Sequence, residues 1–202
     1  MIHISPLVLM ADMLFEKAAT PASIVFQLFV LAGSVVGCWI LSRLVDKLWL
    51  RLLATGAAVF IFELFTGPMW INEHLGPWAY VYLDISWVLT VGWTVLILGV
   101  VVLTDHYLPQ WSEKWRFLVY LAVLLLLVVV LEIIVVNIGI RSYAPEVLAA
   151  TSGVKLFGAP IEILFYAPVF TSLVITFYKY WSFVIDDATL IPVKKRRWGR
   201  AI

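Results

Sequence analysis

Five long runs of apolar residues, separated by short polar connections, dominate the pattern of this sequence. A helix needs roughly 20 mostly apolar residues to cross about 30 Å of membrane hydrocarbon. The connections are too short to form a soluble domain, so we expect a single all-α membrane domain over residues 1–202 with five transmembrane helices. The predicted spans are residues 22–41, 52–71, 78–103, 117–140 and 157–181.

The residues before the first span indicate where helices begin. Thr20 can cap the free amides of a helix, and Pro21 suits its first turn. Ser5 and Pro6 follow the same pattern, which predicts a short helix over residues 6–17. This segment is too short to span the membrane, and we expect it to lie in the membrane interface.

The composition supports a membrane protein, since 63% of the residues are hydrophobic, 13% are charged and the mean hydropathy is +1.02. A soluble domain carries roughly 25% charged residues, and a soluble fold of this composition would expose large apolar patches. The net charge of +1 gives no indication of a nucleic-acid partner. The single cysteine, Cys38, excludes a disulfide framework.

Basic residues gather on one side of the predicted spans. Of the 14 Lys and Arg residues, only Lys17, Arg141 and Lys155 fall on the side of the amino terminus. Loops rich in basic residues stay in the cytoplasm. We therefore expect the amino terminus outside and the carboxyl terminus inside, in a multi-pass plasma (cell inner) membrane. The basic tail over residues 194–197 fits this topology and can also bind anionic lipid.

Four carboxylic acids lie within the predicted spans, where an ionisable side chain is costly and by default marks a functional site. They are Glu63, Asp84, Glu132 and Glu162, one on each of the last four predicted spans. With a rise of about 1.5 Å per residue, all four are expected in the outer half of the membrane. This convergence predicts a shared pocket. Alternatively, Asn137, Ser86 or Tyr166 satisfies a buried acid structurally.

Aromatic residues surround the same level of the predicted bundle. Part of this pattern is the usual belt of Trp and Tyr at membrane interfaces. Deeper rings beside carboxylic acids suit carbocation chemistry, because a ring face stabilises positive charge. A protonated carboxyl can donate to an alkene or epoxide, and a second carboxylate can accept a proton or position water. We expect Glu63 and Glu132 to donate, and Asp84 and Glu162 to accept or orient. The candidate substrate-binding residues are Tyr80, Trp87, Trp93, Tyr143, Phe165 and Tyr166.

The second and third spans share a layout with the fourth and fifth. In each pair an acid on the first helix precedes a loop rich in Gly, Pro and aromatic residues, and a second acid lies near the start of the next helix. This layout predicts a two-helix repeat over residues 52–103 and 117–181, with the first span outside it.

Residues 160–166, Pro-Ile-Glu-Ile-Leu-Phe-Tyr, follow an acid-bearing span and an aromatic loop. In this they resemble the Pro-x-Glu-Glu-x-x-Phe-Phe motif of the lycopene cyclase domain in small membrane carotenoid cyclases. Ile163 stands where that family has its second glutamate. The first predicted repeat is loosely similar to the membrane carotenoid hydratases. The resemblance implies proton-initiated cyclisation or hydration of a polyisoprenoid without a redox cofactor, with Glu162 and Glu132 matching the family's acids.

The sequence has no clustered histidines, phosphate-binding loop, nucleophile elbow or Cys-x-x-Cys motif, so we expect no metal and no cofactor. A site of four carboxylates for Mg²⁺ or Ca²⁺ stays conceivable. The favoured function is a membrane enzyme that cyclises, hydrates or isomerises a polyisoprenoid or carotenoid-like lipid. Two alternatives stay open, a non-enzymatic transmembrane subunit of a larger membrane complex and a proton-coupled carrier.

Overall fold

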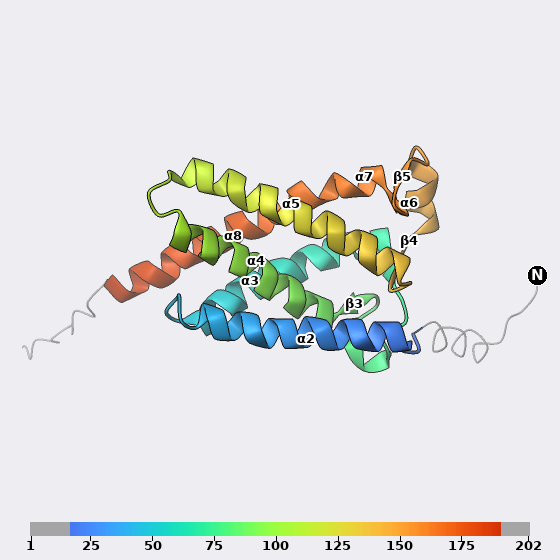
Figure 1. Ribbon diagram of the computed structural model, residues 1–202, viewed down its shortest axis with the longest axis horizontal. Coiled ribbons are helices and arrows are strands. Elements are labelled where there is room, and N and C mark those ends of the chain that lie inside the picture. The colour runs from blue at the N-terminus through green and yellow to red at the C-terminus, as the bar shows by residue number, and fades with distance from the viewer. Residues whose placement is uncertain (1–16, 191–202) are drawn as a thin grey trace, which may run out of the picture.

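The computed structural model describes residues 17–190, and within them five helices are long and apolar enough to cross a membrane (Figure 1). For these residues, the prediction of five helices that are long and apolar enough to span a membrane is confirmed. The predicted interfacial helix and the basic tail lie outside the described residues, apart from Lys17. The five helices are α2 (Pro21–Leu41), α3 (Leu48–Thr66), α4 (Trp87–Tyr107), α5 (Glu113–Asn137) and α8 (Tyr166–Leu190).

Helix α4 lies at the centre of the bundle. It contacts α2, α3, α5 and α8, while α3 and α5 each also pack on α8. In Figure 1, α4 runs between α2 and α5, and α2 lies along the outside of the other helices. Helix α2 begins where the sequence predicts, with the Thr20 hydroxyl accepting from the Ser23 amide at 3.2 Å and Pro21 as its first residue.

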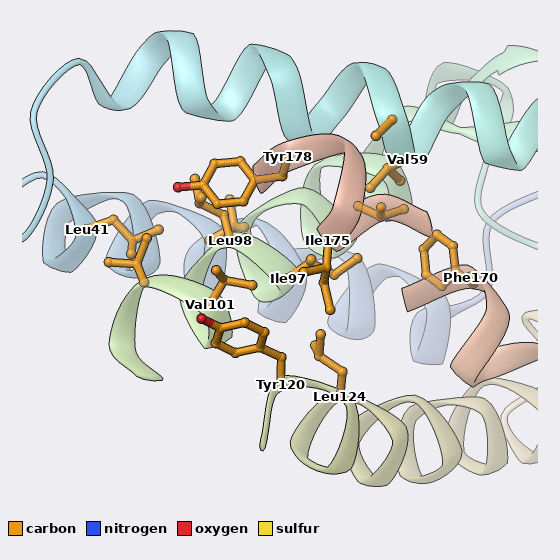
Figure 2. Packing of buried hydrophobic residues seen from close by; sticks show 14 residues of the cluster. Leu41, Val59, Ile97, Leu98, Val101, Tyr120, Leu124, Phe170, Ile175 and Tyr178 are labelled. Carbon is orange, nitrogen blue, oxygen red and sulfur yellow. The ribbon is translucent and has the colours of Figure 1, made fainter. Parts of the chain in front are cut away.

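A core of interlocking apolar side chains joins α3, α4, α5 and α8 (Figure 2). Ile97 and Leu98 extend from α4 toward Leu124 of α5 and Ile175 of α8, and all four are essentially inaccessible. Because lipid is as apolar as these side chains, close packing and not water exclusion holds such helices together. This core fills the middle of the bundle and leaves the polar groups at its two ends.

Two glycines let α2 and α4 approach closely. A Cβ atom on Gly37 would lie 2.5 Å from Cγ1 of Val95, and one on Gly92 would lie 2.7 Å from Cγ1 of Val30. Val95 is buried and β-branched, so its side chain has little freedom to move away. By contrast, a Cβ atom on Gly33, one turn before Gly37, meets nothing within 4 Å.

We therefore expect Gly37→Ala to lower the free energy of unfolding by about 1–3 kcal/mol, because the added methyl group overpacks the α2–α4 contact. Gly33→Ala is the matched control on the same helix, and its methyl group should be tolerated. Thermal unfolding of the purified protein in detergent measures both. Equal losses in the two variants would contradict the role assigned to the Gly37 contact.

The connections at one end of the bundle, here called the loop end (residues 67–86 and 138–165), contain short strands that an all-α prediction misses. Strand β1 (Trp70–Asn72) pairs antiparallel with β4 (Arg141–Tyr143), which ties the two connections together. Two hairpins accompany this pair, β2 (Tyr80–Tyr82) with β3 (Ile85–Ser86), and β5 (Lys155–Leu156) with β6 (Ala159–Pro160). Four short helices complete the loop end, η1 (Gly67–Met69), η2 (Pro77–Ala79), α6 (Pro145–Ala150) and α7 (Ile161–Leu164).

The two hairpins correct the predicted starts of the third and fifth spans. Those spans were expected from residues 78 and 157, but α4 begins at Trp87 and α8 at Tyr166. Each hairpin turns at an apolar residue with positive φ, Leu83 at 47° and Phe157 at 47°. Their hydrophobic residues extend the apolar runs, so composition alone does not separate hairpin from helix. Asp84 and Glu162 consequently lie before the spanning helices and not inside them.

The opposite end of the bundle carries a compact group of charges on α4, α5 and α8. Asp105 accepts from Arg116 at 2.9 Å and from Lys179 at 2.7 Å, and the Tyr120 hydroxyl also donates to it. Lys179 also pairs with Glu113 at 2.9 Å. These contacts join α4, α5 and α8 at the end of the bundle opposite the loop end, beyond the apolar core.

Candidate functional site

Glu63 and Glu132, the two predicted acids that do lie on spanning helices, line one small cavity near the loop end. The cavity has a volume of about 30 Å³, room for a water-sized group. Glu63 comes from α3 and Glu132 from α5, so two of the four predicted acids line the same cavity. The other lining residues are Trp70, Trp93, Val128, Arg141, Tyr166 and Phe170.

Glu132 is buried and bound on both carboxylate oxygens. Arg141 Nη1 lies 2.8 Å from one oxygen, and the Tyr143 hydroxyl donates to the other at 2.7 Å. Both partners belong to β4, which follows α5 closely and brings its side chains back over the helix end. Burial, and then the negative charge of Glu132, raises the pKa of the Tyr143 phenol, which keeps it a hydrogen-bond donor.

Arg141 is held on three sides. Its Nε donates to Asn72 Oδ1 at 3.1 Å, and its guanidinium lies 5.0 Å from the ring centre of Trp70. Both Asn72 and Trp70 belong to β1, so the β1–β4 pairing sets the position of the arginine. The side chain is only 9% exposed. A buried ion pair needs such additional partners, since each charge is otherwise costly to remove from water.

Glu63 has different surroundings from Glu132. The Thr90 hydroxyl of α4 lies 2.5 Å from a carboxyl oxygen of Glu63 and 2.9 Å from the Ser86 carbonyl oxygen. It has one proton to share between these two acceptors. No Lys, Arg or His nitrogen of residues 17–190 forms an ion pair with Glu63. The two acids of this cavity therefore differ, one held by a cation and a phenol, the other by a hydroxyl group.

Aromatic rings form one wall of the cavity. Tyr166 and Phe170 of α8 stack with a centroid distance of 5.8 Å and an interplanar angle of 8°. Trp70 meets Tyr166 edge-on at 4.9 Å, and Trp93 meets Phe170 edge-on at 5.8 Å. Figure 2 shows Phe170 at one end of the core cluster. Phe170 also lines the cavity. Of the predicted substrate-binding residues, Trp93 and Tyr166 line the cavity and Tyr143 contacts Glu132.

Asp84 belongs to a polar network beside the cavity. It pairs with Lys17, whose ammonium lies 3.9 Å from the ring centre of Tyr80. The Tyr80 hydroxyl donates to the Asn72 carbonyl at 2.7 Å, and burial raises the pKa of Tyr80 to about 12. Asn72 also donates from its side chain to the Asp84 carbonyl at 2.6 Å. Asp84 and Tyr80 thus reach the cavity only through Asn72 and Arg141.

The three other predicted site residues lie away from the cavity. Glu162 accepts from the Ser152 amide at 2.8 Å, and hydrogen bonds from Ser152 lower the pKa of its carboxyl group. Trp87 donates to the Trp78 carbonyl at 3.0 Å, and Phe165 is 70% exposed. The four acids do not form one cluster, and residues 17–190 contain no group of three His, Cys, Asp or Glu side chains placed to hold a metal ion.

Arg141, Thr90 and Trp70 are site residues that the sequence analysis did not select. In the sequence, Arg141 contributes to the predicted topology and not to the predicted site. It is nonetheless the only arginine among the three basic residues on its side of the predicted spans, and it follows Glu132 by nine positions. An arginine just beyond an acid-bearing span is a pattern from which this ion pair could have been predicted.

Comparison of the chain with protein-family models, with curated proteins and with solved structures finds no match. The similarity of residues 160–166 to the carotenoid cyclase motif stays a prediction.

Proposed function

We propose that this protein is a membrane enzyme that performs acid–base chemistry on an isoprenoid-like lipid without a cofactor. One observation carries the proposal, namely that two carboxyl groups with different partners, the half-buried Glu63 and the buried Glu132, face one cavity walled by aromatic rings. Pairs of acids in different environments are the usual arrangement for one donor and one acceptor. The reaction classes that fit are cyclisation, isomerisation and hydration.

In the proposed reaction, Glu63 is the proton donor, as expected from the sequence. Glu132, which the sequence analysis expects to donate as well, is instead the acceptor, because Arg141 pairs with its carboxylate. The Glu63 O–H bond breaks as its proton joins an alkene carbon, and the neighbouring carbon becomes cationic. The faces of Tyr166, Phe170 and Trp93 stabilise this charge. A second alkene of the substrate then attacks the cation, or water adds to it, and a C–H or O–H proton passes to Glu132. Return of that proton to Glu63 completes the cycle, so no redox partner is needed.

The inward orientation of the acids favours an enzyme over the two alternatives. A subunit that pairs its acids with a partner protein would present them on its outer surface, but Glu132 is 6% exposed and is neutralised by Arg141 of the same chain. A carrier needs polar access from both membrane faces, whereas Ile97, Leu124 and Ile175 pack tightly beneath the cavity.

The topology and the repeat belong to the same proposal. We place the loop end outside and the charged end of α5 and α8 in the cytoplasm, because the basic residues gather there. The repeat is supported by the order of elements, since residues 48–107 and residues 113–190 both run helix, strand, hairpin and helix. The strands of the two halves also pair with each other, with Ile71 opposite Ser142 at the centre of the β1–β4 pair. Each repeat would contribute one acid, Glu63 or Glu132, to the cavity.

The test is expression in a bacterial host that makes linear polyisoprenoids, followed by mass spectrometry of extracted lipids. We expect a new lipid of the same mass as a linear precursor after cyclisation or isomerisation, or heavier by one water after hydration. An empty vector and Glu146→Gln, which changes an exposed acid on α6, are the controls. Unchanged lipids together with stoichiometric co-purification of other membrane proteins would contradict the enzyme and favour a subunit.

A further inference from the structure

An apolar groove runs along the bundle between α2 and α5, with α4 as its floor. It has a volume of about 480 Å³ and is lined mainly by aliphatic side chains, phenylalanines and glycines of these three helices. Figure 1 shows α4 running between α2 and α5 over most of their length. Phe29 of α2 is 70% exposed and Val130 of α5 is 46% exposed, and these two side chains border the groove on its two sides.

Glycines on two of the three helices keep this groove open. A Cβ atom on Gly33 of α2 or on Gly99 of α4 would meet no atom within 4 Å. These glycines differ from Gly37 and Gly92, which also border the groove but bring α2 and α4 into contact. The space over Gly33 and Gly99 is thus not required for helix packing, which indicates room for a ligand.

The groove ends at the candidate site. Trp93, Glu132 and Arg141 line both the groove and the small cavity that holds Glu63. Apart from these, the only polar side chain among the described residues that line the groove is Ser34, whose hydroxyl donates to the Val30 carbonyl at 2.8 Å. An occupant would therefore be apolar along its length and would meet polar groups only at the end near Glu132.

The shape of the groove suits an extended hydrocarbon chain. On α4 it extends from Leu89 to Leu103, which is about 21 Å at 1.5 Å per residue. Its volume of about 480 Å³ is spread along this length, so the groove is elongated and its lining is mainly apolar, as an extended isoprenoid chain requires.

We infer that this groove binds the chain of a linear polyisoprenoid, which enters sideways from the bilayer between α2 and α5 and places its terminal alkene at Glu132 and Glu63. The inference rests on the proposed function for the choice of an alkene-containing chain. The groove itself accounts for the remainder, because it is elongated, apolar along its length and continuous with the cavity that holds the acids.

The test uses geranylgeraniol that carries a photoactivatable diazirine in mid-chain, with the full-length protein in phosphatidylcholine nanodiscs. After irradiation, peptide mass spectrometry maps the labelled positions. We expect labelling concentrated in residues 26–37 of α2 and 127–135 of α5, and competition by unlabelled geranylgeraniol. Gly33→Leu and Gly99→Leu should each reduce this labelling about tenfold, equivalent to about 1.4 kcal/mol of binding free energy.

Ala32→Leu is the matched control, because Ala32 is exposed on α2 beside Gly33 but does not line the groove. It should label like the wild type. Labelling spread evenly over the exposed faces of all five helices, or unchanged in both glycine variants, would overturn the inference. Equal labelling of the same segments by a diazirine-bearing phosphatidylcholine would show bulk lipid only, which also overturns it.

The same variants separate this inference from the proposed function. Labelling needs no turnover, so specific and competable labelling in a protein that changes no lipid would leave the groove intact and reject the enzyme. Conversely, normal product formation by correctly folded Gly33→Leu and Gly99→Leu would reject the groove and retain the enzyme. If the leucine variants do not fold, competition by geranylgeraniol in the wild type still decides whether the groove is specific.

Discussion

Glu63→Gln should lower product formation by about 10²–10⁴-fold, the usual contribution of a positioned general acid. Glutamine has almost the same size and still accepts a hydrogen bond from Thr90, so the packing of α3 against α4 should persist. It has no acidic proton to donate to an alkene. The product is quantified by mass spectrometry and divided by the amount of variant protein in the membrane fraction.

Two comparisons make this result specific to the proton. Glu146→Gln is the same chemical change at an exposed position outside the cavity and should retain full product formation. Thr90→Val removes the hydroxyl that orients Glu63 while leaving the acid in place, so we expect a smaller loss than for Glu63→Gln. Full activity of a folded Glu63→Gln protein would show that another group supplies the proton.

The five helices were predictable because a bilayer imposes one requirement on every span, a length of about 20 apolar residues. Local capping was also readable, as Thr20 and Pro21 show at the start of α2. The starts of α4 and α8 were not. Leu83 and Phe157 adopt positive φ in tight hairpins, a conformation that is unusual for such side chains, so the sequence around them looks like a continuing helix.

The candidate site was predictable in part, for a related reason. Glu63 and Glu132 lie on true spanning helices, so the depth calculated from the helical rise placed them together. Asp84 and Glu162 lie in the loop end, before α4 and α8, so the helical rise does not give their depth. Arg141 could not be placed beside Glu132 without the β1–β4 pairing, which joins residues 69 positions apart in sequence.

That pairing has a chemical consequence for the two acids. It fixes Arg141 over Glu132 through Asn72 and Trp70, while Glu63 on the facing helix is left with Thr90. One cavity therefore holds two acids in unequal environments although both sit on apolar helices. The loop end, which looks like a simple connection in the sequence, is what makes the proposed donor and acceptor different.

Arg141→Met should be the most damaging single substitution for stability, with a loss of about 3–5 kcal/mol in the free energy of unfolding. Methionine fills much of the same space, but it leaves the buried Glu132 carboxylate with the Tyr143 hydroxyl as its remaining hydrogen-bond donor. The asparagine side chain of Asn72 loses a partner as well. The measurement is the unfolding transition in detergent, followed by helix content.

The double variant Glu132→Gln with Arg141→Met tests whether this loss comes from the stranded charge. A neutral glutamine can keep the hydrogen bond from Tyr143, so the double variant should recover a large part of the stability lost in Arg141→Met. Residues in direct contact typically show interaction energies of about 0.5–3 kcal/mol in such a cycle. Losses that simply add would contradict the ion pair as the organising contact. Neither variant should form product, because the double variant lacks the acceptor Glu132 and Arg141→Met displaces it. A double variant that recovers its fold without recovering activity would separate the structural role of Arg141 from the chemical role of Glu132.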